Sequence, residues 1–214
     1  MSLSSQAEDF AHALSATVRG VVGPHCPIFR ADVMHEARQV TIAQDDGQGI
    51  PLSVRGQSLL FLRAEYRCEA DHSGEFLRVR WSRIAVFFRD GTANNPPLIR
   101  YEFERPKNRD VPSAHLHIHH EGLCAECANS NISAVYQLGG TNNPSAKRAQ
   151  ARIASGKYAH QQDFHFPLGG ERFRPCLEDF LHALIYEFGI DHEPGWQEVL
   201  EHGREQWRLR QTAA

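Results

Sequence analysis

Apolar and polar side chains alternate with a period of two through most of residues 28–118. This period is typical of β-strands whose two faces meet different surroundings. The segments between the apolar runs are short and rich in Gly, Pro, Asn and Asp, which favour turns and leave no room for crossover helices. Consecutive strands are therefore expected to pair as antiparallel hairpins in a meander. The six predicted strands are 28–34, 38–44, 58–69, 76–89, 98–104 and 113–119.

Helical periodicity marks the two ends of the chain. Near the N-terminus, Ser5 and Glu8 have the spacing of a capping box, and the helix that they begin is expected to end near residues 23–24. Toward the C-terminus, one helix is expected to end at Gly189 and another to run from about 194 to 210. The apolar positions that carry the first two patterns are Ala7, Phe10, Leu14, Val18 and Val21, then Leu177, Phe180, Leu181, Leu184 and Phe188.

Strands in the middle of the chain and helices at both ends predict an α+β fold. We expect a curved antiparallel meander sheet of about six or seven strands, with an N-terminal helix and two C-terminal helices packed against it. A chain of 214 residues can bury one sizeable core, so residues 1–214 are predicted to form a single domain. Residues 121–162 are mostly polar, with only a weak helical pattern near 145–155, and are predicted to be a long polar loop or insertion within that domain. Regular structure is expected to resume near 164–167.

Composition excludes two classes of protein. The formal net charge of -3 rules out a strongly basic nucleic-acid binder that acts through bulk electrostatics. The longest apolar run, Ile84 to Phe88, is far shorter than the roughly 20 residues of a membrane-spanning helix, so no membrane association is expected. Five scattered cysteines fit a reducing compartment, and Glu8 interrupts the apolar stretch that an export signal would need. These features predict a cytoplasmic protein.

Histidines are concentrated in the predicted strand 113–119. Alternation places His115, His117 and His119 on one face and the apolar residues between them on the other. Imidazoles two residues apart on a strand are close enough to bind one metal ion or to exchange protons with one substrate. A solvated or hydrogen-bonded sheet face explains such a cluster equally well.

Zinc is the metal that this pattern would suit. Cys124 and Cys127 form a C-x-x-C pair directly after the histidines, and thiolates at that spacing hold zinc together with His115, His117 or His119. The remaining ligands would, however, come from the long polar loop. The sequence therefore favours a metal-free state with no cofactor, and zinc is the alternative.

Without a metal, the histidine face predicts acid–base chemistry. His115 and His117 can remove and deliver a proton, while Arg100 and Arg105 from the preceding strand and its end stabilise charge on a phosphate. Cleavage of RNA is the simplest reaction for such a set, because the 2′-hydroxyl supplies the nucleophile. The predicted catalytic residues are these four.

A second group of residues is predicted to return beside the histidine strand and complete an anion site. These candidate substrate-binding residues are His165, Arg172 and Arg174, together with His119. The same arginines flank a turn before the helix that starts near Leu177, and a purely structural turn explains them as well.

One metal-binding family shares part of the pattern. His115, His117 and Glu121 fit the H-x-H-x-x-x-E core of the cupin metal motif, which makes a metal-binding cupin-like protein a third option. Arg172 stands where the second cupin motif would bring its histidine, and the C-terminal third of the chain has helical rather than strand periodicity.

A longer resemblance covers the half of the chain from Arg100 onward. The strand A-H-L-H-I-H at 114–119 and the segment H-F-P-L-G-G-E-R-F-R-P-C-L-E-D at 165–179 resemble a signature of uncharacterised bacterial proteins. That resemblance implies a gene beside a helix-turn-helix regulator, in a locus that looks like a toxin–antitoxin pair. The R-Y-E-F at 100–103 before the histidine strand is also similar to TumE-type toxins.

Together, these features predict a cytosolic component of a toxin–antitoxin-like or stress-response locus that acts on RNA or a nucleotide through the histidine-lined face. A cognate helix-turn-helix regulator and RNA are the predicted partners. The alternative is a non-catalytic protein-binding module, an antitoxin or a scaffold.

Overall fold

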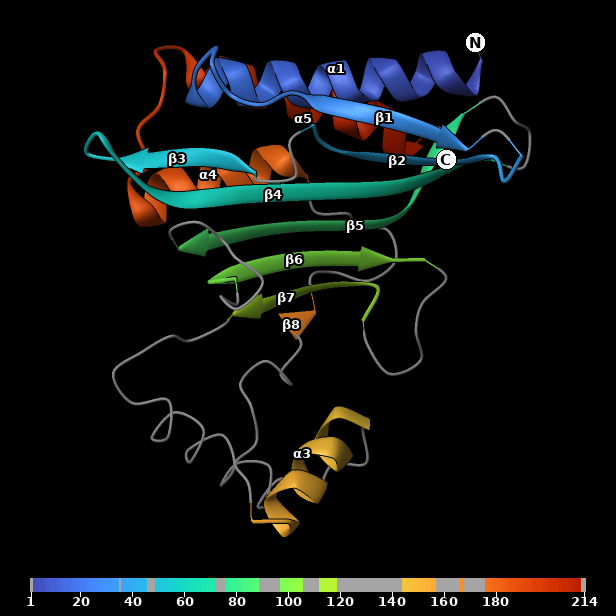
Figure 1. The fold of residues 1–214 in the computed structure, drawn as a ribbon, viewed down its shortest axis with the longest axis vertical. Coiled ribbons are helices and arrows are strands. Elements are labelled where there is room, and N and C mark those ends of the chain that lie inside the picture. The colour runs from blue at the N-terminus through green and yellow to red at the C-terminus, as the bar shows by residue number, and fades with distance from the viewer. Residues whose placement is uncertain are drawn as a thin grey trace.

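The computed structural model describes residues 2–34, 36–45, 49–71, 76–88, 97–105, 112–118, 144–156, 166–167 and 176–212. These residues form an α+β fold in which one antiparallel sheet is covered by helices from both chain ends, as the sequence predicts (Figure 1). The helices are α1 (Leu3–Val22), α3 (Pro144–Ala154), α4 (Leu177–Phe188) and α5 (Trp196–Thr212). The strands are β1 (Phe29–Met34), β2 (Gln39–Gln44), β3 (Ile50–Val54), β4 (Gln57–Ala70), β5 (Leu77–Phe88), β6 (Ile99–Glu104), β7 (Ala114–Ile118) and β8 (Phe166–Pro167).

The sheet is a meander over most of its width. Within the described residues its strand order is β1-β2-β4-β5-β6-β7-β8, with β3 also paired to β4. Each predicted strand corresponds to an observed one to within two residues at either end. Of the predicted polar loop 121–162, only residues 144–156 are described, and they contain α3 where the weak helical pattern lies.

Strand β3 is absent from the sequence-based prediction. β2 and β3 pair with successive parts of the 14-residue β4, β2 with residues 65–69 and β3 with residues 57–62. Gly49 has φ +94°, and a Cβ there would lie 2.8 Å from the Leu62 carbonyl oxygen, so only glycine fits. The turn to β4 has positive φ at Arg55 (52°) and Gly56 (76°), as a two-residue hairpin requires.

Helices α1, α4 and α5 fill one face of the sheet with apolar side chains. The residues predicted for the buried stripe of α1 are all buried, and Phe10 packs against Tyr66 of β4 and Trp207 of α5. The start of α1 differs from the prediction, because the N-cap is Ser2, whose hydroxyl accepts the N–H of Ser5. None of the described helices combines the length and apolar composition needed to cross a bilayer.

One buried carboxyl lies where α1, α4 and α5 meet. Glu178, in the first turn of α4, is 4% exposed, and its Oε1 accepts the Thr17 hydroxyl at 3.0 Å. Gly203 of α5 faces it so closely that a Cβ there would lie 2.5 Å from Oε1. Burial raises the pKa of Glu178, because charging it would leave a carboxylate in an apolar setting.

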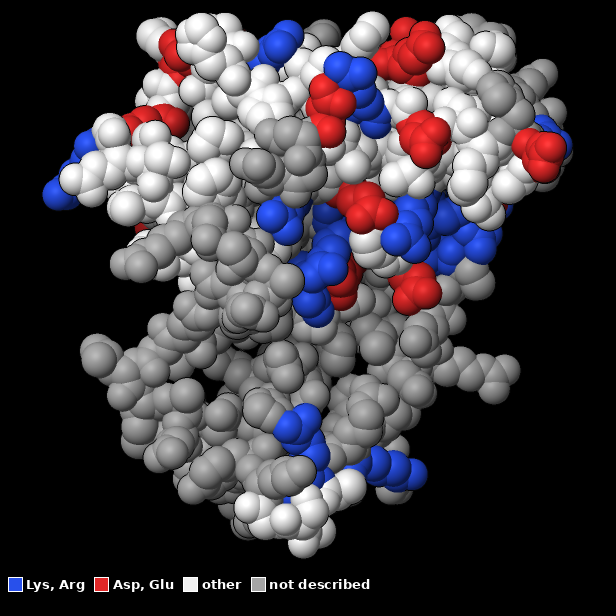
Figure 2. All heavy atoms as spheres, viewed as in Figure 1, with Lys and Arg blue, Asp and Glu red and all other residues white. Residues whose placement is uncertain are grey.

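The opposite face of the sheet is polar. Figure 2 shows basic and acidic side chains gathered in a band across the middle of the molecule, over β4, β5 and β6. Arg67 pairs with Glu65 at 3.0 Å and stacks over the Trp81 ring, 4.7 Å from its centroid. Because the apolar core occupies the helix side, charged residues on alternate positions of these strands are directed to this polar face.

Candidate functional site

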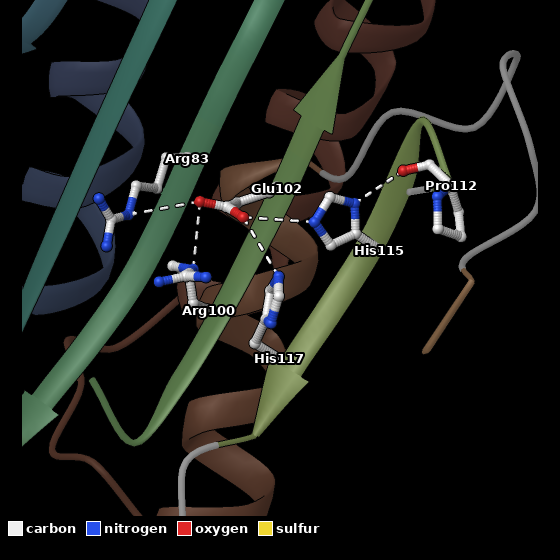
Figure 3. A network of polar contacts seen from close by, with 6 residues as sticks. All are labelled: Arg83, Arg100, Glu102, Pro112, His115 and His117. Carbon is white, nitrogen blue, oxygen red and sulfur yellow. Dashed lines mark hydrogen bonds and ion pairs between the residues drawn. The ribbon is translucent and has the colours of Figure 1, made fainter. Parts of the chain in front are cut away.

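Strand pairing brings five polar residues together on the polar face. Antiparallel register sets Glu102 of β6 opposite Arg83 of β5 on one side and His115 of β7 on the other, and Arg100 opposite His117. The residues between them, such as Tyr101 against Phe180 of α4, fill the helix side. We call Arg83, Arg100, Glu102, His115 and His117 the Glu102 cluster (Figure 3).

Both imidazoles direct Nε2 at the same carboxylate oxygen. The distances from Glu102 Oε2 are 3.3 Å to His115 Nε2 and 3.2 Å to His117 Nε2. The two rings meet edge to face, with centroids 4.8 Å apart. His115 Nδ1 lies 2.8 Å from the carbonyl oxygen of Pro112, which orients that ring from behind.

The other oxygen of the carboxylate faces the arginines. Arg100 Nε lies 3.1 Å from Glu102 Oε1, and Arg83 Nε lies 3.7 Å from the same atom. The two carboxylate oxygens therefore have different partners: Oε1 contacts guanidinium groups, and Oε2 contacts imidazoles (Figure 3).

The cluster is largely shielded from solvent. His115 and His117 are 5% and 4% exposed. Burial raises the pKa of Glu102, but the close contacts with His115 and His117 and the charge of Arg100 outweigh it, so the pKa lies well below its ordinary range. Glu102 is thus a carboxylate at any physiological pH. Burial also lowers the pKa of Arg100, although the neighbouring Glu102 opposes that effect.

The structure brings together three of the four predicted catalytic residues: His115, His117 and Arg100. Arg105 lies one residue past the end of β6, roughly 16 Å along the strand from Arg100 at about 3.3 Å per residue. Its backbone N–H donates to the Arg80 carbonyl, and it is not part of the cluster. The other predicted site residues lie outside the described part of the chain: His119, Cys124, Cys127, His165, Arg172 and Arg174.

Glu102 is the residue that sequence reasoning missed. It occupies the centre of the cluster, although it is not among the site residues predicted from the sequence. Two signals in the sequence point to it: Arg100 and Glu102 alternate with Tyr101 and Phe103, and the next strand carries the histidines. What the sequence lacks is the cross-strand register that sets Glu102 opposite His115.

Three side chains of the cluster offer metal-ligating atoms within reach of one ion. Glu102, His115 and His117 have donor atoms that all lie within 4.8 Å of one another. Two of the three were predicted as zinc ligands from the sequence, and the third comes from a strand rather than from the polar loop.

Comparison with protein-family models, with curated proteins and with solved structures found no match in any of the three, so the function has to be argued from the Glu102 cluster itself.

Proposed function

We propose that the Glu102 cluster binds and hydrolyses a small phosphate ester of the nucleotide class. The observation that supports this is the number of basic groups around a single carboxylate. Arg83 and Arg100 are permanently charged, and Glu102 neutralises only one of them. The cluster therefore keeps a positive charge even when both imidazoles are neutral, and such a face attracts an anion.

Burial favours a nucleotide over RNA, the two substrate classes that the sequence suggests. The imidazoles are about 5% exposed or less, and the Arg100 and Glu102 side chains are 19% exposed, whereas the Arg83 side chain is 40% exposed. Exposure thus increases from the imidazoles to Arg83. This arrangement suits a small ligand that inserts one phosphoryl group beside Arg83. An RNA strand lying along the sheet would need the imidazoles themselves at the surface.

Each group then has a role in hydrolysis. Arg83 and Arg100 stabilise the negative charge that builds on the phosphoryl oxygens. His115 and His117 activate water, because imidazole accepts a proton or binds a metal ion near neutral pH. The water oxygen bonds to phosphorus as the ester P–O bond breaks, and the proton removed from water goes to the leaving alkoxide.

The test uses the purified full chain without an affinity tag. We expect it to hydrolyse a chromogenic phosphodiester or a cyclic nucleotide, and we expect His115→Ala with His117→Ala to lower the rate at least a hundredfold, the usual contribution of such groups. Arg100→Ala should raise KM by weakening phosphate binding. Arg67→Ala removes the same charge from the polar face outside the cluster and should change neither parameter. Hydrolysis that persists in the histidine double variant would refute the proposal.

The predicted setting in a toxin–antitoxin-like locus remains a prediction. A hydrolase that depletes nucleotides should arrest growth when it is expressed alone, and the helix-turn-helix regulator should relieve the arrest. The non-catalytic alternative predicts instead a stoichiometric complex with the regulator and no hydrolysis by the free chain. Growth curves with and without the neighbouring gene, combined with the hydrolysis assay, separate the two.

A further inference from the structure

The His115 ring has a defined tautomer. A peptide carbonyl oxygen only accepts hydrogen bonds, so the 2.8 Å contact with Pro112 O requires a proton on Nδ1. In a neutral ring the other nitrogen, Nε2, then carries a lone pair. That lone pair is directed at a carboxylate oxygen 3.3 Å away, Oε2 of Glu102. Two lone pairs in this arrangement repel, so a positive species belongs between them.

Distance distinguishes the two species that could fill this role, a proton and a metal ion. A charge-assisted N–H···O bond to a carboxylate is about 2.7–2.9 Å long. In a tetrahedral zinc site with bonds of about 2.0–2.2 Å, neighbouring ligand atoms are about 3.3–3.6 Å apart. Glu102 Oε2 lies 3.3 Å from His115 Nε2 and 3.2 Å from His117 Nε2. These separations are closer to the distance between neighbouring ligands of a metal ion than to a charge-assisted hydrogen bond.

We propose that Glu102, His115 and His117 bind one divalent transition-metal ion of the zinc class. Their donor atoms lie within 4.8 Å of one another, a spacing at which three side chains could hold one ion. Two imidazoles and a carboxylate suit zinc and its neighbours, whereas magnesium and calcium prefer oxygen ligands alone. Three protein ligands are also the number found in catalytic zinc sites, which keep one position open.

Neighbouring groups orient the three proposed ligands. Pro112 O fixes the His115 tautomer and so directs the Nε2 lone pair toward Glu102. Arg100 and Arg83 hold Oε1 of Glu102, which leaves Oε2 for the ion.

This inference departs from the metal-free state that the sequence favours. From the sequence, the remaining ligands would come from the polar loop, whereas in the structure β6 supplies a third ligand in Glu102. The geometry of the three ligands alone supports metal binding. Only the use of the open position for a phosphoryl oxygen or a water molecule rests on the proposed function.

The test is titration of the metal-free, untagged full chain with Co²⁺ followed by competition with Zn²⁺. We expect one equivalent of Co²⁺ to bind with visible absorption bands of a low-coordinate site, and Zn²⁺ to displace it. Glu102→Gln keeps the shape of the side chain and should weaken binding at least tenfold, as should His117→Ala. The control His12→Ala removes an exposed imidazole from α1 and should leave binding unchanged.

Thermal unfolding distinguishes a variant that has lost metal binding from a variant that does not fold. Zn²⁺ should raise the Tm of the wild-type chain and of His12→Ala, but not that of a folded Glu102→Gln variant. Binding of less than a stoichiometric amount by the folded wild type would overturn the inference. So would binding that survives in Glu102→Gln and His117→Ala but is lost when Cys124 and Cys127 are replaced by serine. Stoichiometric binding without any phosphodiester hydrolysis would support the metal site and refute the proposed function.

Discussion

The substitution Gly203→Ala should have two opposing effects on stability, a gain in helix propensity and a clash with Glu178. Gly203 lies inside α5, where replacing glycine by alanine normally stabilises a helix by about 1 kcal/mol. Here the new Cβ would lie 2.5 Å from Oε1 of Glu178, 2.7 Å from its Cγ and 2.9 Å from its Cδ. Atoms do not approach so closely, so Glu178 or α5 has to move.

The hydrogen bond with Thr17 opposes movement of Glu178, although a pocket that Glu178 and Gly203 both line lies beside the contact. Glu178 is 4% exposed, and the Thr17 hydroxyl donates to its Oε1. Overpacking of an interior site costs about 1–3 kcal/mol. Subtracting the propensity gain leaves Gly203→Ala destabilising by about 1 kcal/mol, within a range of roughly 0–2 kcal/mol.

A double-mutant cycle separates the two effects. Glu178→Ala removes the colliding atoms, so in that background Gly203→Ala should stabilise the chain by about 1 kcal/mol. Glu178→Gln keeps the volume, so in that background the substitution should remain destabilising. Urea unfolding of the six proteins at one pH gives the free energies. If Gly203→Ala stabilises the wild-type chain as much as the Glu178→Ala chain, the contact between α4 and α5 is wrong.

Three further measurements test the buried Glu178, the turn at 55–56 and the core beneath β6. Burial holds the pKa of Glu178 above its ordinary value of 4.5, so the folded state keeps the proton to higher pH than the unfolded state, and stability falls as pH rises between the two values. Glu178→Gln should flatten that fall in unfolding free energies measured from pH 4 to pH 8; an unchanged slope would contradict the raised pKa. Asp191 accepts hydrogen bonds from the backbone N–H groups of residues 55 and 56, at 3.0 and 2.6 Å. Asp191→Ala should therefore lower the free energy of unfolding in urea by about 1–2 kcal/mol, and Asp191→Asn should lower it by less. Phe103→Ala empties a fully buried position on the helix side of β6 and should cost about 3–5 kcal/mol by the same assay, and a loss under 1 kcal/mol would place that side chain outside the core.

Short-range patterns in this chain predicted the elements, and long-range pairing explains most of what they missed. Alternation correctly put His115 and His117 on one face, because side-chain direction along a strand depends only on the period of two. Which residues lie across from them depends on register, which follows from the hairpin connection rather than from either strand alone. Glu102 was missed for that reason.

Two other differences have local causes. β3 was not predicted; Gly49 and Pro51 are poor strand residues, yet Gly49 is needed where the chain passes close to β4. Ser2 and Ser5 both precede the same apolar stripe, and either can cap it. Helix α1 uses the earlier one and so gains nearly one more turn.

The Glu102 cluster is built from three strands that follow one another along the chain, whereas the apolar core joins residues from both chain ends. The terminal helices contribute none of the five side chains, so we expect fraying at the helix ends to leave the register of the cluster unchanged. We also expect β5, β6 and β7 to resemble one another in hydrogen-exchange protection. A ligand held by Glu102 and the two imidazoles would cross-link β6 to β7 and slow amide exchange in that hairpin, with little effect on α1 or α5.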